Sequence, residues 1–188
     1  MSNLKLFMVL VGCKPKGRYT EQHDVFFGIG HSLKDLIPHI TSFWPETKGQ
    51  FHIDAWREVT QVNGFSIQVI ESQEAVENQQ HLFFLNLGGY RPGIFEELHY
   101  KMLVVAPDSA KAIASSKQTL FYQAEGFKGA ESHIDDKYKL DVDDLYQVKD
   151  MLLPLFAEKF RLRIIAQNGP EDEQHIGYVK LSKLNGKD

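Results

Sequence analysis

The chain has 188 residues, of which 43% are hydrophobic, 12% aromatic and 24% charged, which excludes a disordered or fibrous chain. A chain of this length can bury a core without disulfide or metal support, and we expect a single domain over residues 1–188. The formal net charge of −4 supplies no broad basic surface, so we expect neither nucleic acid nor a membrane as a partner.

Cysteine content and apolar runs indicate the compartment. The single cysteine, Cys13, permits no intramolecular disulfide, which is typical of a reducing environment. The longest apolar run, Leu6–Val11, is far shorter than the roughly 20 residues that cross a bilayer. The segment also lacks the basic leader and cleavage site of a signal peptide. We therefore expect a soluble cytoplasmic protein.

The first half of the chain predicts strands and one helix. Residues 4–11 and 25–29 are apolar runs of strand length, separated by a turn rich in glycine. Ser32 and Asp35 form a capping box that begins a helix, and its apolar stripe continues to Phe43. Residues 51–59 alternate as in a half-buried strand, and Asn63-Gly64 predicts a hairpin with residues 65–70.

The same order of features recurs in the second half. A second apolar strand, a glycine turn and a Glu-x-His strand follow residue 80, and a helix is predicted from Asp108 or Ser109 to Leu120. At one constant shift, Gly12, Glu21 and His23 match Gly88, Glu97 and His99. With a short insertion, His52-Ile53-Asp54 matches His133-Ile134-Asp135, which predicts a turn at Asp143-Asp144 and a strand from Leu145 to at least Val148, whereas the spacing of residues 145–153 fits a helix equally well.

We interpret the chain as an α+β protein of two tandem β-β-α-β-β repeats. Repeat one covers about residues 4–70, repeat two about 81–151, and a C-terminal extension about 152–188. The repeats are expected to be related by a pseudo-two-fold axis and to share a mixed sheet covered by helices. In the extension, residues 160–166 and 175–181 are predicted to pair around the turn Asn168-Gly169-Pro170.

Three stretches resemble a known family. They are the run from Glu21 to Gly30, the run from Phe51 to Val59 with the following Val62-Asn-Gly-Phe, and Leu-Gly-Gly-Tyr-Arg-Pro-Gly from Leu87. They resemble the bacterial domain-of-unknown-function family 1543, whose members carry one or two copies of a short repeat. The resemblance covers roughly residues 4–148 and implies a shared fold for the two copies, but no activity. Repeat one departs from the family turn, with Gly12-Cys13 in place of the glycine pair.

Histidines and carboxylates form two matched sets. On a strand, residues two apart project from the same face, so each pair places an imidazole beside a carboxylate. If the two strands of one repeat are neighbours, two histidines and two carboxylates converge. The candidates are Glu21, His23, His52 and Asp54 in repeat one and Glu97, His99, His133 and Asp135 in repeat two.

Three interpretations of these residues are open. Mixed imidazole and carboxylate ligands suit Zn, Mn or non-haem Fe. Alternatively, a carboxylate orients a histidine that acts as a general base. The third interpretation is structural, a hydrogen-bonded network that holds the strands together. Cys13 has glycine at the matched position, Gly89, so it is interpreted as a buried thiol and not as a nucleophile.

Two functional hypotheses follow. The first is a non-catalytic binding or assembly protein, a homo-oligomer such as a dimer that pairs through an exposed sheet edge or the extension. The second is an enzyme that uses a divalent metal or a histidine general base on a small molecule. The sequence names no substrate and no reaction.

Overall fold

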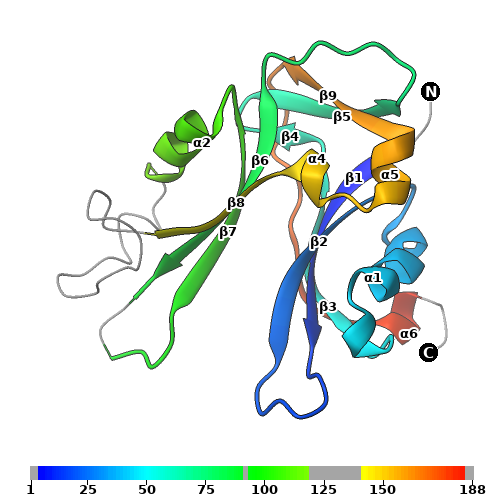
Figure 1. Cartoon of the computed structure of the whole chain (residues 1–188), viewed down its shortest axis with the longest axis vertical. Helices are drawn as coiled ribbons and strands as arrows, with labels where there is room; N and C mark the ends of the chain where they lie inside the picture. The colour runs from blue at the N-terminus through cyan, green and yellow to red at the C-terminus, as the bar shows by residue number, and fades with distance from the viewer. Residues whose placement is uncertain (1–3, 91–92, 119–140, 185–188) are drawn as a thin grey trace. The chain divides into compact units, whose positions relative to one another are not determined.

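A computed structural model describes residues 4–90, 93–118 and 141–184 (Figure 1). The fold is α+β. It divides into two compact units, the first formed by Met1–Val76 with Met151–Asp188 and the second by Glu77–Asp150. The residues predicted as a C-terminal extension therefore belong to the first unit. Each unit is described by itself below.

The first unit is built on a four-stranded antiparallel sheet in the order β10-β3-β1-β2. Its strands are β1 (Lys5–Cys13), β2 (Gln22–Gly30), β3 (His52–Val59) and β10 (His175–Lys180). The apolar run of β1 suits an inner strand, because most of its side chains are buried on one face or the other. The predicted strands at 4–11, 25–29 and 51–59 are therefore confirmed.

Short helices cover one face of this sheet. The chain passes through η1 (Leu33–Leu36), α1 (Ile37–Phe43) and η2 (Pro45–Thr47) between β2 and β3. The rings of Phe26 on β2 and Phe43 on α1 lie 5.4 Å apart, so α1 packs on the face that carries Phe26. Asp35 Oδ2 accepts a hydrogen bond from the Ser32 N–H at 3.0 Å, as the capping box predicts.

The first unit also contains a smaller sheet, in the order β4-β5-β9. Its strands are β4 (Gln61–Val62), β5 (Phe65–Glu71) and β9 (Phe160–Ala166). The predicted hairpin is confirmed, since Asn63 and Gly64 both have positive φ, the conformation of a type I′ turn. Helices α4 (Val148–Met151), α5 (Pro154–Lys159) and α6 (Leu181–Leu184) complete the C-terminal part of the chain.

The second unit is built on one three-stranded sheet. Its antiparallel sheet has the order β7-β6-β8, with β6 (His81–Gly89), β7 (Leu98–Ala106) and β8 (Asp141–Gln147). Helix α2 (Ser109–Ser116) begins at Asp108, whose side chain accepts a hydrogen bond from the Lys111 N–H at 2.8 Å. Ala112 of α2 packs with Phe83, Leu85 and Leu87, so the helix covers their face of β6.

Three details of the predicted fold are wrong. Every strand pair in the described ranges is antiparallel, so the sheets are not mixed. Asp143 and Asp144 lie inside β8 and form no turn; the strand ends at Gln147, and helix α4 follows from Val148. Strands β9 and β10 exist, but β9 pairs with β5 and β10 with β3 instead of with each other.

Asp172 fixes the path of the C-terminal strands on the first unit. Its carboxylate accepts a hydrogen bond from Thr60 Oγ1 at 2.6 Å and from the Thr60 N–H at 3.0 Å. It also accepts one from the Gln61 N–H at 3.1 Å. These donors lie where β3 ends and β4 begins, so one side chain between β9 and β10 satisfies the amides of that bend.

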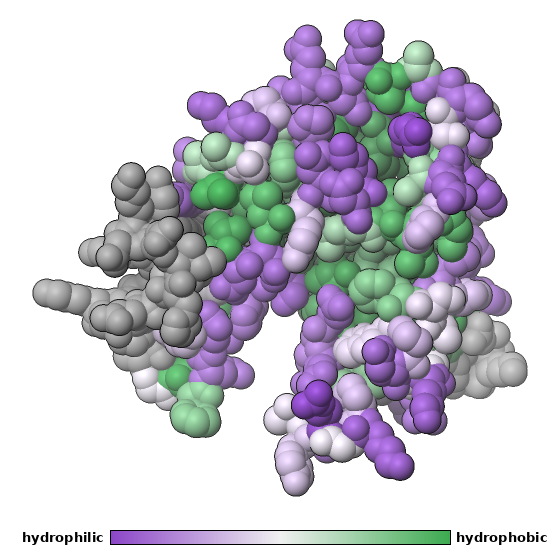
Figure 2. Space-filling model, viewed as in Figure 1, coloured by the Kyte–Doolittle hydropathy of each residue, from purple (hydrophilic) through white to green (hydrophobic). Residues whose placement is uncertain are grey.

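No helix among the described residues is long and apolar enough to cross a membrane. The view in Figure 2 shows hydrophilic side chains over much of the surface, with hydrophobic patches between them.

Replacing Asp172 with alanine is expected to lower the free energy of unfolding by about 1.5–3 kcal/mol, because hydrogen bonds to a charged acceptor are lost and two amides lose their partner. Urea denaturation measures the change. The control is Glu171→Ala, which removes the neighbouring exposed carboxylate and should change the free energy of unfolding by less than about 0.5 kcal/mol. Equal effects of the two substitutions would contradict this role of Asp172.

Candidate metal centre

The first cluster lies on the face of the sheet opposite α1. Gly12 on β1 is paired with His23 on β2 and with His52 on β3. Phe26 is paired with Val9, an odd-numbered position of β1, whereas Gly12 is even-numbered, so the two belong to opposite faces. The cluster thus forms where three neighbouring strands bring polar residues to one level of the sheet.

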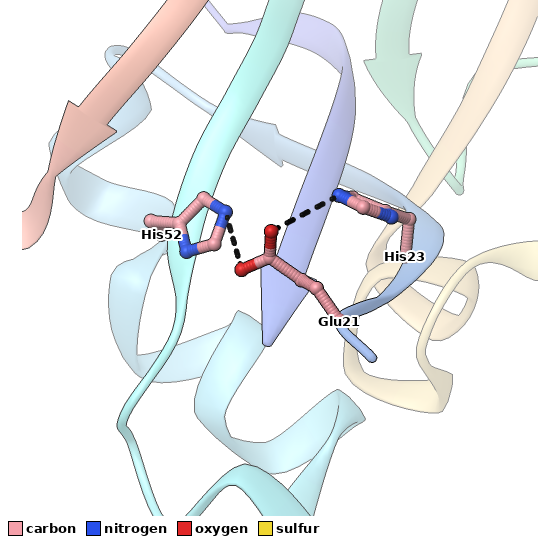
Figure 3. A group of neighbouring side chains, drawn as sticks. All are labelled: Glu21, His23 and His52. Atoms are coloured by element: carbon pink, nitrogen blue, oxygen red, sulfur yellow. Dashed lines mark ion pairs between the residues drawn. The ribbon is translucent and has the colours of Figure 1, made fainter. Parts of the chain in front are cut away.

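Two imidazoles and two carboxylates meet at this level. His52 Nε2 lies 3.3 Å from Glu21 Oε1 and 3.2 Å from Asp54 Oδ1. His23 Nε2 lies 3.3 Å from Asp54 Oδ2 and 3.9 Å from Glu21 Oε2. Each imidazole nitrogen therefore faces one oxygen of each carboxylate. In Figure 3 the Glu21 carboxylate lies between the two imidazoles, with one oxygen directed at each.

Burial differs across the cluster. The His52 side chain is 9% exposed and that of Asp54 is 25% exposed, whereas Glu21 and His23 are exposed by 45% and 41%. Asp54 Oδ2 is buried and accepts no hydrogen bond from any described residue. The cluster thus has a buried side on β3 and a side open to solvent on β2.

Glycine at position 12 leaves the space in which the side chains meet. A Cβ on Gly12 would lie 2.6 Å from Asp54 Oδ2 and would also collide with the His52 imidazole. A side chain of any size on the central strand would therefore push the flanking residues apart.

A β-bulge sets the position of Asp54. In the pairing of β1 with β3, Leu10 is opposite Ala55 and Val11 is opposite Ile53, so Asp54 is the extra residue. An extra residue bends the strand locally and changes the direction of nearby side chains. Strand β10 is also irregular here, because its register with β3 shifts between Ile176 and Val179.

Tyr178 is a neighbour of the cluster that the sequence did not indicate. Its ring lies 4.4 Å from the His52 imidazole, centroid to centroid, at an interplanar angle of 36°. The contact depends on the pairing of β10 with β3 across a long stretch of sequence. No spacing rule connects the two residues.

Cys13 is adjacent to the cluster but is poorly suited to be a nucleophile. Burial raises the pKa of its thiol, and the Glu21 carboxylate raises this pKa further. The Sγ atom lies 3.1 Å from the carbonyl oxygen of Gln50, to which the thiol donates. A buried thiol with a raised pKa forms little thiolate at neutral pH.

The second unit contains a related cluster. His99 Nε2 lies 3.7 Å from Glu97 Oε2 and 3.4 Å from Asp143 Oδ2. Gly88 on β6 is paired with His99, and a Cβ on Gly88 would lie 2.5 Å from Asp143 Oδ2 and 2.6 Å from Glu97 Oε1. Asp143 is the extra residue of a bulge, because Asn86 is opposite Asp144 and Leu87 is opposite Val142.

The predicted site residues have three outcomes. The structure brings together the four of the first unit. It places Glu97 and His99 together in the second, with Asp143 as the third member. His133 and Asp135 lie outside the described residues. The strand beside β6 that matches β3 is β8, so Asp141-Val142-Asp143 occupies the place that the sequence match gave to His133-Ile134-Asp135. The sequence signal that could have identified this segment is its pattern of carboxylate, apolar residue and carboxylate, Asp141-Val142-Asp143 in β8.

Two comparisons bear on fold and family. The chain superposes on the crystal structure of a protein Il1583 from Idiomarina loihiensis with a TM-score of 0.59, over 93% of this chain and 95% of that chain, at 22% sequence identity. This likeness is one of fold. No significant match to the chain is found among curated proteins.

A family model agrees with the resemblance noted in the sequence. Residues 18–69 match the family described as Domain of Unknown Function (DUF1543). This range contains every side chain of the first cluster. The match covers 52 of the 188 residues, and it is the segment that supplies the first cluster that is similar to this family.

Proposed function

We propose that the first unit binds one divalent transition-metal ion between Glu21, His23, His52 and Asp54. The observation that carries the proposal is the set of four N···O separations, which run from 3.2 to 3.9 Å. Ligand atoms at about 2.1 Å from a tetrahedral Zn²⁺ lie about 3.4 Å from one another. Charge-assisted hydrogen bonds between nitrogen and oxygen are shorter, at about 2.7–2.9 Å.

The count of protons supports the same conclusion. A neutral imidazole carries one proton on one of its nitrogens, so its Nε2 donates at most one hydrogen bond. Here each Nε2 faces two carboxylate oxygens, and Asp54 Oδ2 accepts no hydrogen bond from the described residues. A cation at the centre would be attracted to both carboxylates and would accept the lone pairs of both imidazoles.

The ligand set narrows the class of metal. Two imidazoles with two carboxylates suit Zn²⁺, Fe²⁺ or Mn²⁺ better than Ca²⁺ or Mg²⁺, which prefer oxygen ligands alone. The exposed side formed by Glu21 and His23 leaves room for water or a small molecule on the metal. A metal that takes water as a fifth ligand on this side can lower the pKa of that water, so the proposal includes a metal-dependent hydrolytic activity.

We also infer that the two units derive from one duplicated β-β-α-β unit. The pairs Gly12–His23 and Gly88–His99 support this inference, because both lie at the same level of their sheets. The bulges at Asp54 and Asp143 support it as well. The duplicated unit ends at its third strand, because helix α4 and not a fourth strand follows β8.

A second candidate function is self-association through β10. This strand is at the edge of its sheet, and its Ile176 and Tyr178 side chains are exposed by 80% and 60%. An edge strand that exposes large apolar side chains is suited to pair with another strand, here that of a second copy.

The metal site predicts that His52→Ala lowers the affinity for Zn²⁺ by at least about tenfold, since loss of even an outer partner of a ligand costs 10–100-fold. Isothermal titration of the metal-free full chain measures this affinity. His31→Ala is the control, because it removes an exposed histidine outside the cluster and should leave the affinity unchanged. Equal affinity of the wild type and His52→Ala would overturn the proposal.

Stability measurements separate the metal site from a structural network. At 100 times its dissociation constant, Zn²⁺ should raise the free energy of unfolding of the wild type by about 2.7 kcal/mol, and this gain should be absent in His23→Ala. In EDTA the two proteins should unfold within about 0.5 kcal/mol of each other. A large destabilisation of His23→Ala in EDTA, with no gain from Zn²⁺ in the wild type, would favour the network.

Self-association predicts that Ile176→Lys shifts the chain to a monomer, because a lysine on an edge strand opposes strand pairing. Size-exclusion chromatography with light scattering gives the mass over a range of concentrations. Glu171→Lys is the charge-matched control and should leave the mass unchanged. A wild type that is monomeric at every concentration would contradict this function.

A further inference from the structure

The second unit has its own cluster of metal-ligating side chains, with a different composition. Glu97, His99 and Asp143 each offer one ligand atom, and these atoms lie within 4.8 Å of one another. The two N···O separations, 3.4 and 3.7 Å, again exceed those of charge-assisted hydrogen bonds. They agree with the spacing of ligand atoms around one cation.

We infer that the second unit binds a second and harder divalent cation, of the Mn²⁺ type, at Glu97, His99 and Asp143. This inference goes beyond the function proposed for the first unit, because it concerns other residues and another class of cation. It also has an independent test.

The backbone of β6 is shaped for this site. Gly88 leaves the space where Glu97 and Asp143 approach each other, and any Cβ there would collide with both carboxylates. Two carboxylates that approach each other at such a place repel each other. A divalent cation between them removes that repulsion.

A buried polar atom lies beside the cluster. Asn86 is two residues before Gly88 on β6, so its side chain projects from the same face. Asn86 Oδ1 is buried and accepts no hydrogen bond from the described residues, while its Nδ2 donates to Asp144 Oδ2 at 3.3 Å. This face of β6 thus offers a further oxygen that accepts no hydrogen bond from the described residues, of the type that hard cations or their bound water require.

The composition of the cluster sets the class of cation. In the β6–β8 register, Asp141 is opposite Gly88, whereas His52 is opposite Gly12 in the first unit. Among the described residues, the cluster of the second unit therefore has one imidazole where that of the first has two. Imidazole favours Zn²⁺, Fe²⁺ and Cu²⁺, and carboxylate favours Mn²⁺ and Mg²⁺. The exchange shifts the second unit toward the harder ions.

The test uses the full chain with the first cluster disabled by His23→Ala and His52→Ala. Mn²⁺ is titrated into this protein, and free Mn²⁺ is measured by its electron paramagnetic resonance signal. We expect about one bound Mn²⁺, and we expect Glu97→Gln or Asp143→Asn on this background to lower the Mn²⁺ affinity at least about tenfold. Glu97 lies just before β7, so Glu97→Gln keeps the test valid if Asp143→Asn fails to fold.

The matched control is Glu96→Gln, which neutralises the exposed carboxylate next in sequence and should leave Mn²⁺ affinity unchanged. Circular dichroism checks that each variant is folded. Absence of Mn²⁺ binding in the disabled background would overturn the inference, as would binding that Glu97→Gln leaves unaltered. Failure of the first-unit proposal is seen separately, as an equal Zn²⁺ affinity of the wild type and the His52→Ala protein.

Discussion

The close approach of side chains over a glycine is the constraint on which both clusters depend. Gly12 and Gly88 are on the central strands, and each is paired with the histidine of a Glu-x-His strand. Adjacent strands are about 4.8 Å apart, so side chains from the two outer strands must lean across the central one to meet. They can do so only where the central residue has no side chain. At both positions an added Cβ atom would collide with side-chain atoms of the cluster.

The bulged aspartates follow from the same constraint. A regular strand would continue the alternation of faces, and the side chain of Asp54 or Asp143 would keep its ordinary direction. An extra residue at that point twists the strand and leaves the aspartate without a partner residue on the central strand. The site is therefore a product of backbone irregularity as much as of residue type.

The sequence predicted what depends on short-range periodicity. The strand that carries His23, the hairpin at Asn63-Gly64 and the helix capped by Asp108 follow from local patterns, and the structure contains all three. The match of the Glu-x-His strands also required no knowledge of the fold. The glutamate and the histidine of the Glu-x-His pattern in each cluster can therefore be predicted from the sequence alone.

The features of the fold and of the clusters that the sequence did not predict depend on pairing between strands that are distant in the sequence. His133-Ile134-Asp135 resembles His52-Ile53-Asp54 in identity, but register is set by the buried face of β8, whose Val142 and Leu145 pack on the core of the second unit. Likewise β9 and β10 are close in sequence, yet each pairs with a strand of the N-terminal half. A local turn signal cannot distinguish a hairpin from two strands that separate into different sheets.

Asp172 accepts hydrogen bonds from Thr60 and Gln61, which ties the C-terminal strands to the first unit. This connection has a consequence for the order of folding. Residues 77–150 form a continuous unit, so this part of the chain can fold while synthesis continues. The first unit has to wait, because β3 and β5 acquire their outer partners only when the last part of the chain has been made. Until then both strands have an open edge, which is the condition under which chains mispair with one another. Strand β3 is thus synthesised before the whole second unit but acquires its outer partner only after it.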